Sequence, residues 1–506
     1  MDQDQLYIGI DSGTQGTKVV VFSRARGQII SSADASHQIV ETAAGGREQD
    51  PQWWIAACEQ AVAAALQGTG VDPAKVRAMA VSGQQHGLVP LDAQGRVIRP
   101  AKLWCDTETV SQCRVLTAKV GGEAAMIDAI GNQMAAGFTA SKVAWLKAVE
   151  PDNYERLDTV LLPHDYLNYW LTGERKTEYG DASGTAYFDV RRRCWSDILL
   201  NAIDDSGRLQ ASLPKVMAPV EPCGQLTARR AEQWGLPEAV LVAAGGGDNM
   251  MAAIGTGNVQ QGILTASLGT SGTIYAYSDK PVVDDRGELA AFCSSSGGWL
   301  PLVCTMNVTV ATEMFRHLLQ MDLKQFNAAV GQAPPGAEGL LLLPFFNGER
   351  TPALPEAAAT LDGMTSVNVK PANLCRAAME GATLGLRYGL DVMLRNGIRP
   401  TEIRLAGGGA KSDLWRQLAA DVFQLPVVSP VSTEAGALGA ALQAMWCYCN
   451  QNEGETSLAD LCSEFVHLDD ASRARPLGEA TAFYADLYQR YLALERAMRP
   501  MNRGAR

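Results

Sequence analysis

The stretch Ile8-Gly-Ile-Asp-Ser-Gly-Thr-Gln-Gly-Thr-Lys-Val-Val-Val-Phe22 consists of two short apolar runs on either side of a turn rich in glycine and threonine. This pattern predicts a β-hairpin. Gly13 and Gly16 allow positive φ angles and expose peptide N–H groups, while the turn's hydroxyls and the ammonium of Lys18 add further donors. The tip is therefore suited to bind phosphate, although the same residue types also suit an ordinary tight turn.

The Gly-Thr-x-Gly-Thr core of this hairpin occurs again near the middle of the chain. The second copy lies in Ala266-Ser-Leu-Gly-Thr-Ser-Gly-Thr-Ile-Tyr-Ala-Tyr277, again between runs typical of strands. A motif repeated once in each half of a chain indicates two similar domains. We expect each domain to present one hairpin to a shared polyphosphate, which together would form a clamp for ATP.

The composition is that of a folded protein with two domains. The 506 residues exceed what one core normally supports, and 47% of them are hydrophobic and 19% charged. The net charge of −12 argues against nucleic acid and anionic membranes as partners. In addition, no apolar run approaches the about 20 residues of a membrane span.

The eleven cysteines are scattered without the spacing of metal ligands. The N-terminus Met-Asp-Gln-Asp-Gln lacks the basic region and apolar core of a secretory signal, so we expect a cytoplasmic protein with reduced thiols. Cys447 and Cys449 lie in a predicted helix at a spacing that directs them to different faces, which favours a structural role over a metal pair.

Polar side chains follow the predicted buried strand 78–82, in the segment Gly83-Gln-Gln-His-Gly87. A further strand is predicted over 101–106, and its period of two would direct Trp104 and Asp106 to one face. Ligands of open α/β sheets bind beyond the carboxyl ends of strands. The candidates for a sugar or polyol pocket are therefore Gln84, Gln85, His86, Trp104 and Asp106.

This set of residue types suits a carbohydrate. Carboxylate and amide groups bind sugar hydroxyls, and an aromatic ring packs against the apolar C–H face of a sugar. Two alternatives stay open at this point, since a single histidine in a loop is usually held only by local hydrogen bonds and Trp104 could belong to the core. The segment 177–185 is expected to be a polar loop with no assigned role.

Asp248 is the candidate catalytic base. It follows the predicted apolar strand 239–244 and three glycines, in Gly245-Gly-Gly-Asp-Asn249, and precedes a predicted helix over 250–254. The positive N-terminal end of that helix is expected to keep Asp248 ionised at neutral pH. A weak base would suffice for phosphoryl transfer, because the acceptor hydroxyl loses its proton late. The alternative is that Asp248 only caps the helix.

In the second half, a strand is predicted over 402–406 and a helix that continues through Phe423. The connecting turn Gly407-Gly-Gly-Ala-Lys-Ser412 lets a flat base approach the backbone closely, with donors nearby, so adenine or ribose could bind there. The glycine-lysine phosphate loop, the Gly-x-Ser-x-Gly nucleophile elbow and the His-Glu-x-x-His zinc motif do not occur in the sequence.

Five motifs taken in order resemble those of the FGGY family of carbohydrate kinases. They are Asp11-Ser-Gly-Thr-Gln-Gly-Thr-Lys18, Ser82-Gly-Gln-Gln-His-Gly87, Gly245-Gly-Gly-Asp-Asn249, Ser267-Leu-Gly-Thr-Ser-Gly-Thr273 and Gly407-Gly-Gly-Ala-Lys-Ser412. Each motif alone is weak, and the specificity lies in their combination and order along nearly the whole chain. The resemblance implies an α/β, actin/hexokinase-like fold: two duplicated ribonuclease-H-like domains with ATP and sugar in the cleft between them.

The resemblance also implies a role for each half of the chain and for single residues. Residues 1–246 would form the sugar-binding domain with the first phosphate hairpin, and residues 247–506 the domain with the second hairpin and the adenosine site. Asp248 would be the catalytic base and, with Asp11, would hold Mg²⁺. The sugar-binding residues would be Gln85, His86, Trp104, Asp106, Asp248 and Asn249. The ATP-binding residues would be Ser12, Gly13, Thr14, Gln15, Thr17, Lys18, Gly269, Thr270, Gly408, Gly409 and Ser412.

The activity implied is ATP-dependent phosphorylation of a ketopentose, D-xylulose to D-xylulose 5-phosphate, as part of xylose metabolism. Gln85 stands where the family commonly has Met, which keeps another ketose or polyol open as substrate, such as ribulose, glycerol or a deoxy sugar. A second alternative is an actin- or chaperone-like ATPase switch, which would need no sugar pocket. The oligomeric state is not readable from the sequence, and a homodimer stays open.

Overall fold

The computed structural model describes residues 4–43 and 45–502, which form two compact units. Unit 1 contains Met1–Gln260, Ser278–Leu300 and Glu434–Val466, and unit 2 contains Gln261–Tyr277, Pro301–Thr433 and His467–Arg506. The units are thus not continuous along the chain. They differ from the division expected after residue 246 because residues 247–260 and two later segments pack with unit 1. The assignment of one half to the sugar and the other to adenosine stays a prediction.

The sheet of unit 1 has the strand order β14-β15-β6-β1-β2-β3, with β16 paired to β6. β1, β2 and β3 are antiparallel, whereas β6 runs parallel to β1, and β15 and β16 run parallel to β6. The strands are β1 Leu6–Ser12, β2 Gly16–Ser23, β3 Gln28–Ser36, β6 Val76–Gly83, β14 Pro222–Gln225, β15 Leu241–Ala243 and β16 Gly246–Gly247.

The predicted first hairpin is confirmed. β1 and β2 pair from Leu6 opposite Ser23 to Ser12 opposite Thr17, and the peptide N–H of Gly13 donates to the carbonyl oxygen of Gly16 across the turn at 3.0 Å. The short polar tip is therefore held by two paired strands whose central residues are apolar and buried.

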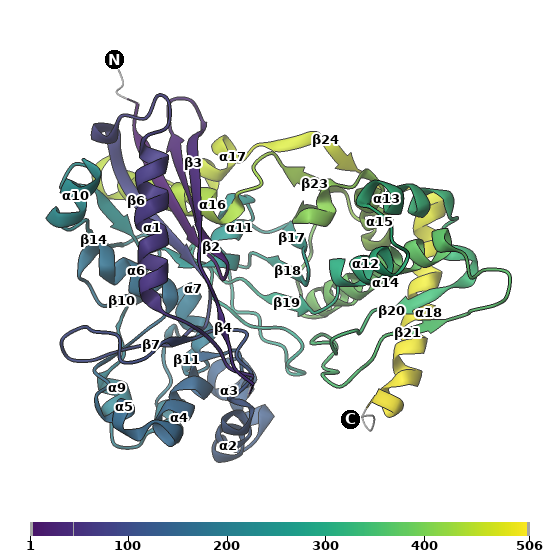
Figure 1. The fold of residues 1–506 in the computed structure, drawn as a ribbon, viewed down its shortest axis with the longest axis horizontal. Helices are drawn as coiled ribbons and strands as arrows, with labels where there is room; N and C mark the ends of the chain where they lie inside the picture. Colours follow the sequence, from purple (N-terminus) through teal and green to yellow (C-terminus); the bar gives the residue numbers. More distant parts are fainter. Residues whose placement is uncertain (1–3, 44, 503–506) are drawn as a thin grey trace. The chain divides into compact units, whose positions relative to one another are not determined.

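Alternate residues of the strands point to opposite sides of the sheet, and both sides carry apolar residues. Helices therefore cover each face. Ile8 and Ile10 pack in a core with Trp54 of α1 (Pro51–Leu66), and Tyr7 packs in a second core with Ala441 of α16 (Ala435–Asn452). α17 (Leu458–Phe465) belongs to the second core. Figure 1 shows the yellow-green α16 and α17 beside the purple strands. These contacts explain why residues 434–466 belong to unit 1.

α16 approaches β1 as closely as backbone atoms permit. A Cβ atom added at Gly9 would lie 1.8 Å from the carbonyl oxygen of Ala437, so only glycine fits at this position. The strand that leads into the first hairpin is thereby fixed against a helix from the far end of the sequence.

The other helices of unit 1 surround the sheet and its long connections. They are α2 Val110–Val120, α3 Glu123–Ile130, α4 Thr139–Val149, α5 Pro151–Glu155, α6 Pro163–Thr172, α7 Tyr179–Ala182, α8 Asp197–Ile203, α9 Arg208–Ala211, α10 Ala228–Trp234 and α11 Asp248–Gly255. The short strands outside the sheet are β4 Val40–Glu41, β5 Arg47–Gln49, β7 Val89–Leu91, β8 Ala101–Lys102, β9 Thr159–Leu161, β10 Lys176–Glu178, β11 Phe188–Asp189, β12 Cys194–Trp195 and β13 Lys215–Met217.

Unit 2 repeats the arrangement, with the strand order β19-β18-β17-β22-β23-β24. As in unit 1, three antiparallel strands are followed by two that run parallel to the first, and an antiparallel strand closes the far edge. The strands are β17 Ile263–Leu268, β18 Gly272–Ala276, β19 Leu302–Thr305, β22 Glu402–Ala406, β23 Val427–Pro430 and β24 Leu468–Ala474. The predicted second hairpin and the predicted strand 402–406 are therefore confirmed.

Besides its main sheet, unit 2 has a small two-stranded sheet and five α-helices among the described residues. They are β20 Leu341–Leu343, β21 Thr360–Asp362, α12 Thr309–Leu318, α13 Leu323–Gln332, α14 Pro371–Arg395, α15 Asp413–Phe423 and α18 Gly478–Asn502. Within residues 4–43 and 45–502, none of the helices combines the length and apolar character that a membrane span requires.

Candidate active site

Three neighbouring parallel strands of unit 1 end at the same level of the sheet. Ser12 of β1 and Gly247 of β16 are both in register with Gly83 of β6, which lies between them. The residues that follow these strand ends are therefore brought together, as expected for a ligand site in an open α/β sheet. They include the first hairpin, the segment with Gln85 and His86, and Asp248.

Asp248 is the first residue of α11, and Gly247 occupies the N-cap position. The alternative that Asp248 merely caps the helix is therefore excluded. Its Oδ1 atom accepts hydrogen bonds from the backbone N of Asn249 at 2.7 Å and from Nδ2 of Asn249 at 2.9 Å.

The helix end is not the dominant influence on the ionisation of Asp248. Burial, followed by the charge of Asp11, raises the pKa of Asp248 to about 7, against the lowering effect of its hydrogen bonds with Asn249. Asp181 raises the pKa further. The favourable end of the helix is thus outweighed by loss of solvent and by two neighbouring carboxylates, and Asp248 is poised to exchange a proton near pH 7.

Asp11 lies at the end of β1, opposite Lys18 of β2. Its Oδ1 atom accepts a hydrogen bond from Oγ of Ser82 at 2.6 Å. Burial raises the pKa of Asp11, Glu434 raises it further, and Ser82 and Lys18 lower it. Because Asp11 also raises the pKa of Asp248, the two carboxylates lie within electrostatic range of each other.

Gln85 and Asn249 meet beside Asp248, as the sequence predicted for a shared pocket. Nδ2 of Asn249 donates to Oε1 of Gln85 at 2.9 Å, and Nε2 of Gln85 donates to Sδ of Met250 at 3.3 Å. Gln85 is 5% exposed. Both polar atoms of its side chain are therefore bound to α11, whereas we had expected them to face the sugar.

His86 follows with a positive φ of 65°, a conformation in which histidine is enriched among residues other than glycine. Its ring packs edge-on against Phe138, with 4.8 Å between ring centroids, and lies 5.7 Å from the ring of Phe292. Oγ1 of Thr139 donates to the carbonyl oxygen of His86 at 3.1 Å. The imidazole is half-buried, and aromatic packing holds it in place.

Trp104 is 39% exposed, so it does not belong to the core. The strand predicted over 101–106 is wrong beyond Lys102, because β8 ends there and the chain turns. Nε1 of Trp104 donates to Oγ1 of Thr14 at 2.9 Å, and Oγ1 of Thr14 donates to Oε1 of Gln84 at 3.4 Å. The structure thus joins the candidate sugar-binding residues Gln84 and Trp104 to the tip of the first hairpin.

The carboxylate of Asp106 is buried, and both of its oxygen atoms accept hydrogen bonds from other groups of the protein. Oδ2 accepts from the backbone N of Arg47 and from Nζ of Lys102, both at 3.0 Å, and Oδ1 accepts from the backbone N of Glu108 at 3.0 Å. Asp106 is 1% exposed. This placement does not support the predicted sugar contact, and we interpret Asp106 as support for the chain segment that carries Trp104.

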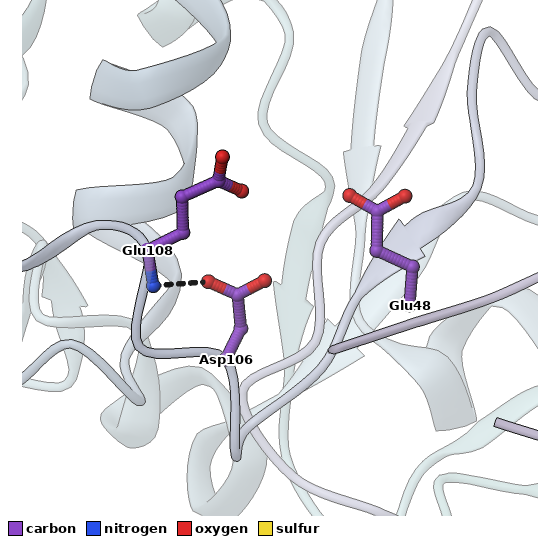
Figure 2. A group of neighbouring side chains, drawn as sticks. All are labelled: Glu48, Asp106 and Glu108. Carbon is purple, nitrogen blue, oxygen red and sulfur yellow. Dashed lines mark hydrogen bonds between the residues drawn. The ribbon is translucent and has the colours of Figure 1, made fainter. Parts of the chain in front are cut away.

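Glu48, Asp106 and Glu108 converge closely enough to suggest a metal site (Figure 2). The three carboxylates already have cationic partners, because the unexposed Lys102 lies among them and Arg99 pairs with Glu48 at 2.6 Å. The Nζ atom of Lys102 lies 2.6 Å from Oε2 of Glu108, 3.0 Å from Oδ2 of Asp106 and 3.3 Å from Oε1 of Glu48. The group is therefore a buried ion cluster with its own internal cation.

The remaining residues of the first hairpin divide into a buried base and an open tip. Ser12 and Thr17 are both buried, and their hydroxyl groups hydrogen-bond to each other, with 3.0 Å between Oγ of Ser12 and Oγ1 of Thr17. Nζ of Lys18 lies 2.7 Å from Oε2 of Glu434. By contrast, Gln15 is exposed and Gly13 partly exposed. The tip is thus the part of the hairpin that is open to a phosphate.

Sequence reasoning missed a buried titratable cluster next to Asp248. Residues 177–185, expected to be a loop, form β10, α7 and a 3₁₀ turn over Ser183–Thr185. Nδ1 of His164 lies 2.5 Å from Oδ2 of Asp181, and Nε2 of His164 lies 3.2 Å from Oδ1 of Asp165. Oε1 of Glu178 accepts from Oγ of Ser295 at 2.9 Å and from the backbone N of Asp181 at 2.7 Å.

Burial controls the protonation of this cluster. It raises the pKa values of Asp165 and Glu178 to about 7 each, and that of Asp181 well above its usual range. His164 lies directly behind the strand ends, since a Cβ atom at Gly83 would be 2.7 Å from its Cβ. The sequence of residues 177–185 shows acidic residues among small ones, and this pattern does not indicate that the segment is buried.

In unit 2, the second hairpin and the turn after β22 are neighbours. The carbonyl oxygens of Gly269 and Thr270 accept from the backbone N atoms of Thr309 and Val308 at 2.9 and 3.1 Å. A Cβ atom at Gly407 would lie 2.8 Å from the carbonyl oxygen of Leu268, so this turn packs against the end of β17.

The turn after β22 exposes Gly408, around which a Cβ atom would meet nothing within 4 Å, whereas Gly409 is buried against Leu268 and Trp415. Ser412 is the N-cap of α15, and its Oγ accepts from the backbone N of Trp415. Gly408 therefore offers open backbone of the kind a flat base needs, while the hydroxyl of Ser412 already has a structural role.

The fold and the sites together define a class of protein. Two sheets of matching strand order, each with a Gly-Thr-x-Gly-Thr hairpin, define an actin/hexokinase-like fold, and close structural neighbours are sugar kinases. Family models then narrow the class. The N-terminal domain of the FGGY family of carbohydrate kinases matches residues 6–255, and its C-terminal domain matches residues 264–448. The chain belongs to the FGGY family of carbohydrate kinases.

Individual relatives cover almost the whole chain. A xylulose kinase from Haemophilus influenzae is 46% identical over 491 residues, which are 96% of this chain and 99% of the relative. One from Streptomyces rubiginosus is 38% identical and covers 87% of each chain. The solved structure of a xylulose kinase from Bifidobacterium adolescentis has a TM-score of 0.82 and 31% identity, and covers 96% of this chain and 99% of that one.

These matches decide between the alternatives that the sequence left open. The protein is a phosphotransferase, and its family implies ATP and a sugar as substrates. The ATPase switch and the other ketose or polyol substrates are not favoured.

Proposed function

We propose that the protein transfers the γ-phosphoryl group of ATP to D-xylulose, giving D-xylulose 5-phosphate, with Asp248 as the catalytic base. The observation that carries this proposal is the position of Asp248, with a pKa raised to about 7, at the start of α11 between the hairpin residue Asp11 and the polar pair Gln85 and Asn249. The 46% identity to a xylulose kinase supports D-xylulose as the acceptor. Because ATP is a substrate, we place the reaction in the cytoplasm.

Asp248 would act on the acceptor hydroxyl of the sugar. In this proposal its carboxylate orients a primary hydroxyl and takes its proton as the oxygen attacks the γ-phosphorus and the bond to the leaving ADP oxygen breaks. Little basicity is required, because the transition state of phosphoryl transfer is loose and the proton leaves late. Asn249, His86 and Trp104 would contact the sugar's other hydroxyls and its apolar face.

Each unit, taken by itself, has a glycine-rich segment that is a candidate for nucleotide contacts. We propose phosphate contacts by the tip residues Gly13, Thr14 and Gln15, and adenosine contacts by Gly408. Lys18, Gly269 and Thr270 stay phosphate-binding candidates, whereas Ser12, Thr17, Gly409 and Ser412 support the backbone of these turns through the contacts described above.

The carboxylates fit the magnesium ion that accompanies ATP. Burial and then the charge of Asp11 raise the pKa of Asp248, and a divalent cation would relieve the repulsion between the two carboxylates. Asp11 and Asp248 would hold the ion, which when bound would neutralise charge on the phosphate oxygens.

The substrate assignment predicts strict dependence of ADP release on one sugar. With ATP and Mg²⁺ present, D-xylulose should stimulate ADP formation at least about 100-fold over the reaction without sugar, because an aligned hydroxyl outcompetes water. A coupled ADP assay over ketopentoses, hexuloses and polyols measures this. Ribulose or glycerol giving the highest kcat/KM would replace D-xylulose as the substrate, and sugar-independent turnover would refute kinase activity.

The raised pKa of Asp248 predicts a specific pH dependence. The base must be deprotonated to accept a proton, so kcat/KM for the sugar should be constant above about pH 7 and fall about tenfold per pH unit below it. The measurement is kcat/KM for D-xylulose from pH 5.5 to 8.5, with coupling enzymes checked by added ADP at each pH. A profile that stays flat down to pH 5.5 would contradict a base with this pKa.

A further inference from the structure

The chain that forms β15 and β16 contains one more residue than the stretch of β6 beside it. The last pair before the interruption is Val242 with Met79, and the first pair after it is Gly246 with Ser82. Three residues of this chain segment therefore lie opposite only two residues of β6. This is a β-bulge, a feature that is rare between parallel strands and is over-represented next to active sites.

The bulge determines how Asp248 leaves the sheet. Successive side chains of a strand point to opposite faces, so one extra residue changes the face that every later residue presents. Asp248 follows β16 directly and begins α11. Without the extra residue, the chain would reach the end of β6 one residue further along the sequence, and Asp248 would no longer occupy its present place.

Gly245 has the backbone conformation that makes the bulge possible. Its φ angle is 72°, in the left-handed region that favours glycine. A Cβ atom at this position would lie 2.4 Å from the carbonyl oxygen of Val81, so a side chain does not fit. The segment therefore approaches β6 closely although its register is interrupted.

The amide of Gln443 binds both polar backbone groups of Gly245. Its Oε1 atom accepts from the backbone N of Gly245 at 2.7 Å, and its Nε2 atom donates to the carbonyl oxygen of the same residue at 2.9 Å. Nε2 also donates to the carbonyl oxygen of Ser295 at 3.2 Å. Gln443 lies on α16 and has no exposed surface. Its amide thus satisfies buried backbone groups as a peptide of a neighbouring strand would.

Asn168 on α6 supports the residue before Gly245. Its Nδ2 atom donates to the carbonyl oxygen of Ala244 at 2.7 Å, and its side chain is fully buried. α6 and α16 contribute to the cores on opposite faces of the sheet, so the bulge is held from both sides. Buried peptide groups without a partner are costly, and these amides therefore favour the bulged register over a regular one.

We propose that Gln443 is a positioning residue for the catalytic base, and that it acts by holding both backbone groups of Gly245 and thereby fixing the bulge that places Asp248. Asn168 assists it from the other face. This inference rests on the proposed role of Asp248. Every contact that carries it lies within unit 1.

The test replaces Gln443 by Met, which has a similar volume and no amide. In Gln443→Met, kcat for D-xylulose phosphorylation should fall about 10- to 100-fold, because a base displaced by about 1 Å no longer meets the acceptor hydroxyl. KM for ATP and for D-xylulose should each change less than about threefold. The coupled ADP assay measures both constants, and calorimetric titration with a nonhydrolysable ATP analogue counts the folded sites.

Asn450→Leu is the matched control. Asn450 lies on the same helix and binds both backbone groups of one residue, since its Nδ2 donates to the carbonyl oxygen of Thr456 at 3.1 Å and its Oδ1 accepts from the backbone N at 3.2 Å. Its loss should leave kcat per folded site within about twofold of the wild type. An equal fall of kcat in Gln443→Met and Asn450→Leu would overturn the proposal.

A double-mutant cycle tests whether Gln443 acts through Asp248. Adding Gln443→Met to Asp248→Asn should lower kcat less than about twofold further, because no base remains to be displaced. Losses that multiply would overturn the proposal. If Gln443→Met fails to fold, Asn168→Leu decides: it removes one contact of the bulge and should lower kcat about 3- to 10-fold with both KM values unchanged, and an unchanged kcat would refute the inference.

Crystal structures keep this inference separate from the proposed function. The wild type should show Gln443 bound to Gly245, and Gln443→Met should show Asp248 displaced together with residues 244–247. An Asp248 carboxylate in the same place in both structures would refute the positioning role even in an enzyme that phosphorylates D-xylulose. Failure of the proposed function appears elsewhere, in a wild type whose ADP release does not depend on the sugar.

Discussion

Asp248→Asn is expected to lower sugar-dependent ADP formation on the order of 1000-fold, while nucleotide affinity changes by less than about threefold. The amide has the size of the carboxylate but cannot take the proton of the acceptor hydroxyl. Because Asp248 belongs to unit 1 and begins α11, its replacement leaves the exposed backbone at Gly408 intact. The coupled ADP assay measures turnover, and calorimetric titration with a nonhydrolysable ATP analogue measures affinity.

Asp197→Asn is the matched control for this experiment. Asp197 is also the first residue of a helix in unit 1, with Ser196 at the N-cap of α8, but it is exposed. It should retain wild-type activity and stability within a factor of about two, which separates the loss of a base from the loss of a negative charge at a helix N-terminus. An Asp248→Asn variant as active as Asp197→Asn would remove Asp248 from the proposed role.

The second large effect is expected at Lys102, whose Nζ atom lies 3.0 Å from Oδ2 of Asp106; Figure 2 draws the three carboxylates of this cluster. Lys102→Met should lower the free energy of unfolding by about 3 to 5 kcal/mol, because it leaves the buried Asp106 and the neighbouring Glu108 without their positive partner, whereas Glu48 keeps Arg99. Burial alone lowers the pKa of Lys102, but Glu108 and Asp106 outweigh it and the net pKa is raised, so the lysine is charged at neutral pH. The ammonium also lies 4.0 Å from the ring centroid of Trp145, a further contact that methionine cannot replace.

Urea titration followed by tryptophan fluorescence measures this loss. Lys119→Met makes the same replacement at an exposed lysine on α2 of the same unit and should change the unfolding free energy by less than about 0.5 kcal/mol. If the two variants unfold at similar urea concentrations, the buried cluster does not depend on Lys102. The variant should also weaken the support of the segment that carries Trp104, since Asp106 holds that segment through the backbone of Glu108 and of Arg47.

Local sequence patterns predicted the hairpins and strands whose conformation is determined by residues adjacent in the sequence. The hairpin over residues 8–22 and its repeat at 266–277 follow from glycine, threonine and β-branched residues at short spacing, and both are confirmed. The predicted strand 402–406 has the same first and last residues as β22, because a glycine turn follows it directly. The predicted strand over 101–106 was wrong beyond Lys102, because the contacts of Asp106 with Arg47 and Lys102 hold the chain in a turn there.

The candidate site was predicted in part. Gln85, Asn249 and Asp248 do come together, since they follow strands that end in register. His164 and Asp181 were missed. They contact each other in a buried site beneath the strand ends, and no short sequence motif indicates that these positions are buried.

Read alone, the chain establishes two glycine-threonine hairpins, an aspartate after a glycine run, and the family to which their order points. These are properties of residues adjacent in sequence, where spacing alone dictates backbone geometry. Only the folded molecule shows that burial and Asp11 raise the pKa of Asp248, that Gln85 is bound to α11, and that Asp106 belongs to an ion cluster around Lys102. Each of these depends on the desolvation and charge contributed by groups distant in the chain, which exist only once the chain has folded.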